Sequence, residues 1–310
     1  MKKFLALLMA IGMLFVIAAC GSDDKDNAGD DNAKGGDEGK TEEVTELTMG
    51  FIPSQEADTI ADNVKPLEEY LTEQLGVPVK AEVMIDFVGL VEGMRTGQVD
   101  IGFTNPFGYV QAKERADVDV LVKAIRHGSD TYKAQYIAAA DSDLNSIDDI
   151  VAKEGLTWAY GDPLSTSGFL FPASQLMEMG IENLDTFFNQ TAVQSHDNAA
   201  LAVLDGSADF ATTFTDVRDN LEKDIPDVKD KLKVIGYTEE IPNDGVSVRK
   251  DLPEDMKAKI KEAFLAINDK PEVLKVMNEV YTWDGIAEAT DEEFDVVREV
   301  YEKFKDQLGE

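Results

Sequence analysis

The chain has 310 residues, a length that fits one large or two medium domains, and 62 acidic against 29 basic residues give it a net charge of −33. This charge argues against a nucleic-acid-binding protein, because a phosphate backbone needs basic patches, while a hydrophobic fraction of 43% suffices for a core and argues against a disordered chain. One cysteine excludes an intrachain disulfide framework and a cysteine-built zinc site, and two distant histidines argue against a histidine metal cluster.

Residues 1–19 have the pattern of a secretory signal peptide. Lys2 and Lys3 precede an uncharged apolar stretch, 4–17, which is shorter than the roughly 20 residues of a membrane span. The only cysteine, Cys20, follows in the sequence Ile-Ala-Ala-Cys, which resembles the lipobox of bacterial lipoproteins. The resemblance implies cleavage before Cys20 and a lipid on its thiol and amine. The alternative is an ordinary exported protein with an unmodified cysteine.

The segment after the cysteine predicts a flexible acidic tether over 20–43. Residues 21–43 contain no apolar residue larger than alanine, so they cannot bury surface to offset the entropy of ordering. As a flexible coil the tether spans on the order of 25–30 Å. We therefore expect a surface-anchored extracytoplasmic protein whose folded part is 44–310.

The first half of the folded part alternates short apolar runs with amphipathic segments, which indicates parallel strands joined by right-handed helical crossovers. The predicted strands are 47–52, 77–84 and 100–103, and the predicted helices are 56–75, 87–96 and a third that opens at 104–106.

A second set of strands and helices follows and has a similar pattern. Its predicted strands are 136–139, 156–160, 191–193, 208–212 and 232–237, and its helices are 147–153, 169–179 and 198–204. A strand at 245–249 returns to the first set, and the tail is helical over 253–267, 271–280 and 291–308. The fold class is therefore α/β with two lobes, 44–137 plus 246–310 and 138–245. Ligands of such open sheets bind beyond the carboxyl ends of the strands, so both lobes should face one cleft.

Three consecutive hydroxyl residues, Ser165, Thr166 and Ser167, lie between a predicted strand and a predicted helix. The first amides of a helix have no partner within it, and together with the hydroxyls they can bind a small oxyanion without any lysine or arginine. Gly168 has no Cβ to keep a ligand away. The alternative is a helix cap without a ligand.

Other polar residues could complete such a site. His196 again lies between a strand and a helix start and can donate a hydrogen bond to an anion, although a lone loop histidine is commonly a surface or capping residue. In the first lobe, Gln55 and Thr104 lie at matching helix starts. Asp216 and Asp244 could hold an ammonium group at the cleft edge, or could simply be solvated like most of the 62 acidic residues.

Four motifs resemble the phosphonate-binding proteins of phosphate/phosphite/phosphonate ABC importers. The motifs are 86–95, 99–101, 161–170 and 195–203, and the likeness covers roughly 45–265. The resemblance implies a two-lobed, type II periplasmic-binding-protein fold with open mixed sheets and a venus-flytrap cleft.

The resemblance also implies roles for individual residues. Ser165, Thr166, Ser167 and His196 would hold the phosphonate oxygens. Asp216 and Asp244 match positions that hold the amino group of 2-aminoethylphosphonate in family members. Where aminoethylphosphonate binders place tyrosines in the first lobe, this sequence has Gln55 and Thr104, with Tyr109 one helical turn further on.

These observations predict a solute receptor of an ABC importer for 2-aminoethylphosphonate, an alkylphosphonate or phosphite. We expect a monomer that is attached to the membrane by its lipid and engages the transporter permease, and that needs neither cofactor nor metal. One alternative is a receptor for another small solute such as phosphate, a sulfonate or a pyrimidine. The other is a secreted hydrolase using Ser167, His196 and Asp216, but the chain lacks the Gly-X-Ser-X-Gly elbow of many hydrolases.

Overall fold

The computed structural model describes residues 44–55 and 57–306. The predicted signal peptide (1–19), Cys20 and the predicted tether (20–43) lie outside the described residues. Within the described ranges, no helix is both long enough and apolar enough to span a bilayer.

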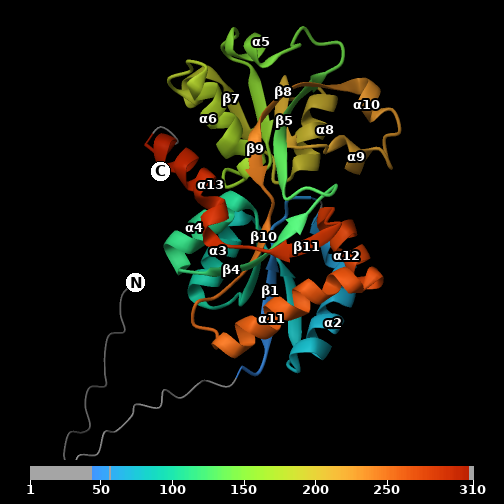
Figure 1. Cartoon of the computed structure of the whole chain (residues 1–310). Coiled ribbons are helices and arrows are strands. Elements are labelled where there is room, and N and C mark those ends of the chain that lie inside the picture. Colours follow the sequence, from blue (N-terminus) through green and yellow to red (C-terminus); the bar gives the residue numbers. More distant parts are fainter. Residues whose placement is uncertain (1–43, 56, 307–310) are drawn as a thin grey trace, which may run out of the picture. The chain divides into compact units, whose positions relative to one another are not determined.

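The first lobe is built on a six-stranded mixed sheet (Figure 1). Parallel pairing joins β1 to β2 and β3, whereas β10 runs antiparallel to β3 and β4, and β11 antiparallel to β4. The order across the sheet is β11 (Gly285–Glu288), β4 (Asp119–Ile125), β10 (Gly245–Val248), β3 (Ile101–Thr104), β1 (Leu47–Phe51) and β2 (Val79–Val83).

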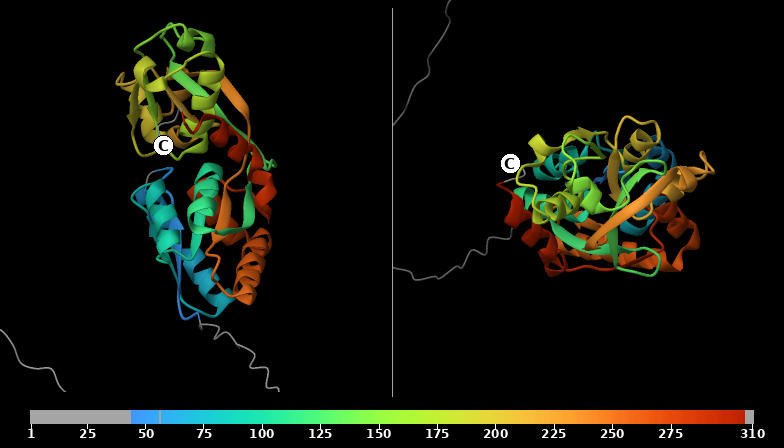
Figure 2. Two further views of the ribbon diagram at one scale, coloured as in Figure 1. Left: turned by 90° about the vertical axis from the view of Figure 1, so that its left-hand side faces the viewer. Right: turned by 90° about the horizontal axis from the view of Figure 1, so that it is seen from above.

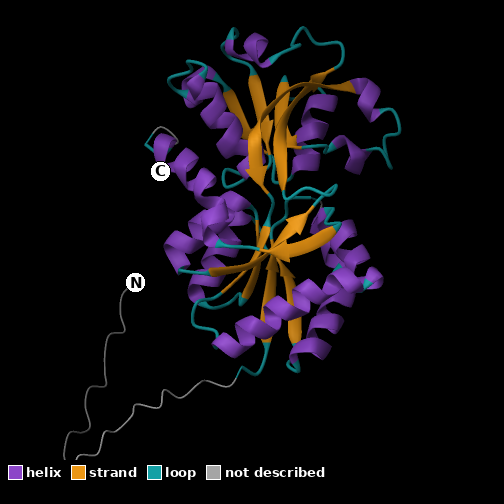
Figure 3. Ribbon diagram, in the orientation of Figure 1, coloured by secondary structure: helices purple, strands orange, loops and turns teal. Residues whose placement is uncertain are grey.

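The second lobe has a five-stranded mixed sheet. Here β6 is parallel to β7 and β8, and β5 is antiparallel to β8 and β9. The order is β7 (Asn189–Ala192), β6 (Thr157–Tyr160), β8 (Phe210–Phe214), β5 (Thr131–Ala139) and β9 (Leu232–Pro242). The predicted α/β fold with open mixed sheets is confirmed, and Figure 3 shows helices flanking the strands of both lobes.

The chain passes between the two sheets at 126–130 and again at 243–244. The second crossing lies where the sequence predicted it. The first was predicted at 137, which falls inside β5 of the second lobe, so the lobe boundary lies about six residues earlier. The sequence also missed β4, because the buried Lys123 interrupts its apolar pattern.

Every predicted strand overlaps an observed one, but β11 and three short helices of the second lobe, 184–187, 218–221 and 228–231, were not predicted. The helices that were predicted differ from the observed ones mainly at two points. The helix predicted over 56–75 is two helices, since Pro66 lacks an N–H and α2 restarts around it. The helix predicted from 169 is preceded by a π-helical turn, η1 (Thr166–Leu170). The α-helices of the first lobe are α1 (Ala57–Asn63), α2 (Lys65–Leu75), α3 (Phe87–Thr96), α4 (Pro106–Ala116), α11 (Glu254–Ala266) and α12 (Pro271–Tyr281). Those of the second are α5 (Ile147–Val151), α6 (Phe171–Glu178), α7 (Leu184–Phe187), α8 (His196–Leu204), α9 (Arg218–Leu221) and α10 (Val228–Lys231).

Each lobe has its own aromatic core. Phe51 and Phe103 stack at 4.3 Å in the first lobe, and Trp158 stacks on Phe169 and Phe210 at 5.6 and 6.0 Å in the second. All but Phe169, which is half-buried, are almost completely buried, so burial of their large apolar surface stabilises the strands on which they lie.

The sequence analysis assigned the predicted helix 291–308 to the first lobe alone. The last helix, α13 (Asp295–Phe304), instead contacts both lobes. It follows the short 3₁₀ turn η3 (Asp291–Phe294). Val297 belongs to the core of the first lobe, and Phe304 belongs to the core of the second. The helix is therefore a third link between the lobes, and the left view of Figure 2 shows this C-terminal segment in red.

Candidate ligand-binding site

A cavity of about 320 Å³ lies where the two lobes and the segments that connect them meet. This volume is within the usual range for small-molecule sites. Of the residues singled out from the sequence, five line the cavity: Gln55, Ser165, Ser167, His196 and Asp244. Four do not: Thr104, Tyr109, Thr166 and Asp216.

The hydroxyl loop at the start of η1 is held in a tight conformation. The Ser165 Oγ accepts a hydrogen bond from the Gly168 amide at 2.9 Å. A Cβ on Gly168 would lie 2.7 Å from that Oγ and 3.3 Å from the His196 ring, so only glycine fits without a shift. The loop thus brings Ser165 and Ser167 to the cavity beside His196.

The core of the second lobe fixes this loop from behind. The Trp158 Nε1 donates to the Thr212 Oγ1 at 2.7 Å, and this hydroxyl donates to the Gly168 carbonyl at 2.5 Å. Both side chains are fully buried. The position of the loop therefore depends on a short chain of hydrogen bonds between two strands, β6 and β8.

Thr166 joins the lobes instead of lining the cavity. Its Oγ1 accepts from the Phe107 amide at 2.8 Å and donates to the Asn105 Oδ1 at 3.2 Å. The Asn105 side chain also accepts from the Gly108 amide, which makes it the N-cap of α4, and donates to the Leu164 carbonyl. Because its hydroxyl already has these partners, Thr166 is a lobe-to-lobe contact in this structure, and its role in ligand binding stays a prediction.

His196 presents an unpartnered nitrogen. The Ser165 Oγ lies 3.4 Å from Nε2, while Nδ1 has no hydrogen-bond partner among the described residues. The Ser165 hydroxyl can donate to Nε2 while it accepts from Gly168, and we assign this arrangement, which places the ring proton on Nδ1. The Nδ1–H is thus an unused donor.

Burial, and to a lesser degree the charge of Arg126, lowers the pKa of His196 to about 3. The ring is therefore neutral at neutral pH. Because this pKa is below the unfolded value near 6.5, burial of the neutral ring favours the folded state above pH 6.5, and this contribution is lost as the pH falls toward 3.

Tyr132 is the main cavity residue that the sequence analysis missed. Its hydroxyl lies near the side chains of Ser167 and Thr166, which lower its pKa slightly. Burial, with the nearby charge of Asp244, raises the pKa of Tyr132, so the phenol stays protonated and can donate. The residue lies at the start of β5, which the sequence analysis placed only from 136, so 126–133 had no assigned role.

Arg126 and Lys133 also line the cavity, which corrects the expectation of an anion site without basic side chains. The Arg126 Nη2 is 2.5 Å from the Asp244 Oδ2, and its Nε donates to the Tyr281 carbonyl at 3.0 Å. The guanidinium lies 5.9 Å from the centre of the Tyr132 ring. Asp244 therefore lines the cavity as half of an ion pair.

Asp216 lies outside the cavity, and its carboxylate is paired with other side chains. Arg218 contacts both of its oxygens, with Nη2 at 2.6 Å from Oδ2, and Gln135 donates to Oδ1 at 3.0 Å. Burial opposes ionisation, but these hydrogen bonds hold the pKa of Asp216 below its usual value. The carboxylate thus has partners of its own in this structure, and a role in holding a ligand ammonium stays a prediction.

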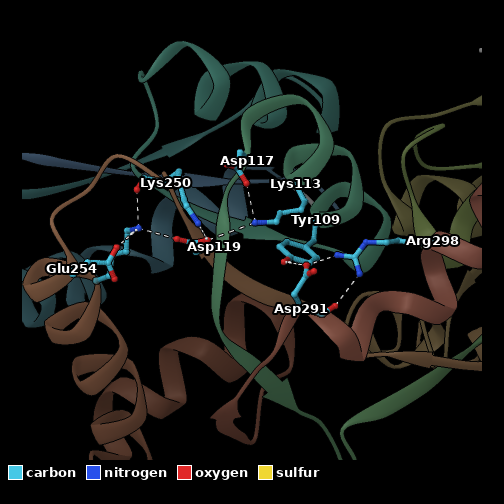
Figure 4. A network of polar contacts seen from close by, with 9 residues as sticks. Tyr109, Lys113, Asp117, Asp119, Lys250, Glu254, Asp291 and Arg298 are labelled. Carbon is cyan, nitrogen blue, oxygen red and sulfur yellow. Dashed lines mark hydrogen bonds and ion pairs between the residues drawn. The ribbon is translucent and has the colours of Figure 1, made fainter.

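Thr104 and Tyr109 are structural residues of the first lobe. The Thr104 Oγ1 lies 3.5 Å from the Gly245 carbonyl and from the Ser247 Oγ, on the adjacent strand β10. Tyr109 is fully buried and hydrogen-bonds Asp291, which also pairs with Arg298 (Figure 4). Burial and then the Asp291 bond raise the pKa of Tyr109. Neither side chain faces the cavity.

No group of three or more histidine, cysteine, aspartate or glutamate residues within 44–55 and 57–306 is placed to hold a metal ion. The donors gathered at the cavity are hydroxyl, imidazole and guanidinium groups. Such donors are suited to oxygen atoms of an anion.

Comparison with known proteins places this arrangement in a family. Residues 49–294 match the model of the family described as ABC transporter, phosphonate, periplasmic substrate-binding protein. The chain is 33% identical to the phosphonates-binding periplasmic protein of Escherichia coli K12, over 76% of this chain and 70% of that protein. It is 30% identical to the phosphate-import protein PhnD of Mycolicibacterium smegmatis, over 70% of each chain.

A solved structure agrees in fold. A binding-protein component of an ABC phosphonate transporter from Pseudomonas aeruginosa superposes with a TM-score of 0.78 at 28% identity, covering 86% of this chain and 88% of that one. The match to the family model spans most of the two lobes and includes the hydroxyl loop and His196. The chain therefore belongs to the family of periplasmic substrate-binding proteins of ABC phosphonate transporters.

Proposed function

We propose that this protein binds the oxyanion of a phosphonate or of phosphite in the cavity between its lobes and presents it to the permease of an ABC importer. One observation carries the proposal. Three residues with neutral donor groups, Ser167, Tyr132 and His196, line one cavity, and the Nδ1 of His196 has no hydrogen-bond partner among the described residues. The relatives named for phosphonates support the same ligand class.

Binding is expected to draw the lobes together. The cavity is lined from the first lobe by residues such as Gln55 and from the second by Ser165, Ser167 and His196, so a bound anion would contact both lobes. A ligand that contacts both lobes has a higher affinity for the closed arrangement and shifts the population toward it. The permease would then recognise the closed form of a monomeric receptor.

A hydrolase is not supported by the geometry. A serine–histidine pair needs a third group that orients the histidine, and here Nδ1 of His196 has no carboxylate partner in the described part of the chain. The Ser165 hydroxyl is 3.4 Å from the ring and is also engaged by the Gly168 amide. These contacts suit binding without turnover.

Calorimetric titration with methylphosphonate, phosphite, phosphate and sulfate tests the proposal. We expect methylphosphonate or phosphite to bind at least tenfold more tightly than sulfate, and the ligand to be recovered chemically unchanged. A protein that binds only sulfate or an uncharged solute, or that hydrolyses the ligand, would contradict the proposal.

We further propose that the mature protein is held at the outer face of the cell membrane by lipid on Cys20. A single acyl chain binds membranes weakly and two or more hold stably, so modification of both the thiol and the amine would anchor the chain. In cells making the full chain, Cys20→Ser should move the protein from the membrane fraction to the soluble fraction, whereas Ser22→Ala, two residues on, should not. Equal membrane association of the two variants would refute the anchor.

A further inference from the structure

Resting on the proposed function, we infer that Arg126 is a specificity residue: it occupies the carboxylate of Asp244 and thereby directs the site to phosphonates with an uncharged organic tail, against aminoalkylphosphonates. The inference is carried by three observations, namely the partners of the two candidate carboxylates, the charge of the cavity and the nature of its walls.

The carboxylates that could hold an ammonium group both have arginine partners. Asp244 is the only acidic side chain among the described residues that line the cavity, and its Oδ2 is 2.5 Å from the Arg126 Nη2. Both side chains are largely buried, with 18% and 15% exposed, so the pair is poorly screened by solvent. Asp216 is outside the cavity and is held on both oxygens by Arg218. An ammonium tail would have to displace a guanidinium that is charged at every physiological pH.

The charge of the cavity disfavours a second cation. Two cationic side chains, Arg126 and Lys133, and one anionic side chain, Asp244, line the cavity, so their charges sum to 2 − 1 = +1. The guanidinium is also held by the Tyr281 carbonyl and lies near the Tyr132 ring, so it is fixed at the cavity. His196 lines the same cavity, and after burial the Arg126 charge is the second cause that lowers the pKa of its ring. The same charge attracts the anionic end of a ligand and repels an ammonium end.

The remaining walls suit an apolar tail. Ile52, Phe87, Phe214 and Tyr237 line the cavity, and the first two are almost completely buried. Contact with such walls favours alkyl groups, because it removes apolar surface from water. An ammonium group against them would lose its hydration without gaining an acceptor.

The test compares two ligands of nearly equal size, n-propylphosphonate and 2-aminoethylphosphonate, which differ by a methyl against an ammonium group. By calorimetry, the wild-type protein should bind n-propylphosphonate at least tenfold more tightly. Equal or tighter binding of 2-aminoethylphosphonate would overturn the inference and leave the proposed function standing. If neither ligand nor methylphosphonate binds, the proposed function fails and this inference fails with it.

Two variants assign the preference to the ion pair. Arg126→Met removes the guanidinium at similar length and frees Asp244, so we expect the ratio of the two affinities to shift at least tenfold toward 2-aminoethylphosphonate. Arg218→Met frees the other candidate carboxylate, Asp216, and should leave that ratio within threefold of the wild type. A shift in Arg218→Met, or none in a folded Arg126→Met, would overturn the inference.

Asp244→Asn provides a second measurement should Arg126→Met not fold. Because Arg126 already occupies Asp244, removal of the carboxylate charge should reduce affinity for 2-aminoethylphosphonate, relative to n-propylphosphonate, by less than threefold. A selective loss of tenfold or more would mean that Asp244 holds the ammonium after all.

Discussion

Replacement of Ser167 by alanine is expected to weaken methylphosphonate binding by about 1–3 kcal/mol, roughly 5- to 150-fold in Kd. Ser167 lines the cavity beside Tyr132, so the variant removes one hydroxyl donor from the cavity wall. A charged acceptor that lacks one of its donors in a buried site accounts for the size of the loss. Titration calorimetry of the two proteins under the same buffer measures it.

Ser174→Ala is the matched control for this experiment. Ser174 is also buried, but its Oγ donates to the Phe171 carbonyl within α6 and the residue does not line the cavity. The Ser174→Ala variant should bind methylphosphonate with a Kd within twofold of the wild-type value. Unchanged affinity in Ser167→Ala, or an equal loss in both variants, would mean that the loop at 165–168 does not contact the ligand.

Replacement of Thr212 by valine should lower the free energy of unfolding by about 2–6 kcal/mol. The change keeps the shape of the side chain but leaves two buried groups, the Trp158 Nε1 and the Gly168 carbonyl, without their hydrogen-bond partner. An unsatisfied buried polar group costs about 1–3 kcal/mol, and the two costs add approximately. Urea denaturation followed by the fluorescence of the two tryptophans, Trp158 and Trp283, measures the effect.

Thr213→Val serves as the comparison, because Thr213 is the next residue on β8 and is equally buried. Its Oγ1 makes only a local bond, to the Phe214 carbonyl at 3.2 Å. We expect this variant to lose less than half as much stability as Thr212→Val. Similar losses would argue that general burial of polar side chains on β8, rather than the link to Gly168, determines the stability of this region.

The elements that could be predicted from the sequence are those determined by neighbouring residues. Asp86, Asn105 and Ser195 each cap a helix through an amide three residues further on, and the helices that they begin were predicted from the local polar and apolar pattern, the last of them two residues late. The hydroxyl loop was found in the same way, since Ser165 caps its own turn. Local rules therefore gave both the alternating architecture and one end of the candidate site.

The features that could not be predicted depend on residues far apart in the chain. Arg126 meets Asp244 and Tyr281 only after both crossings between the sheets and the C-terminal helices are in place. Tyr132 faces Ser167 because β5 belongs to the second lobe, and the predicted boundary near 137 concealed this. Asp216 is different, because its partner Arg218 is two residues away and the Asp-X-Arg spacing was a local signal that the carboxylate is occupied.

A crystal structure of the protein with methylphosphonate tests most directly the claim that neutral hydroxyl and imidazole donors of the second lobe hold the oxyanion. The account predicts phosphonate oxygens within about 3.2 Å of the Ser167 hydroxyl, the Tyr132 hydroxyl and the Nδ1 of His196. A ligand bound only to Arg126 and Lys133, with the 165–168 loop out of reach, would contradict it.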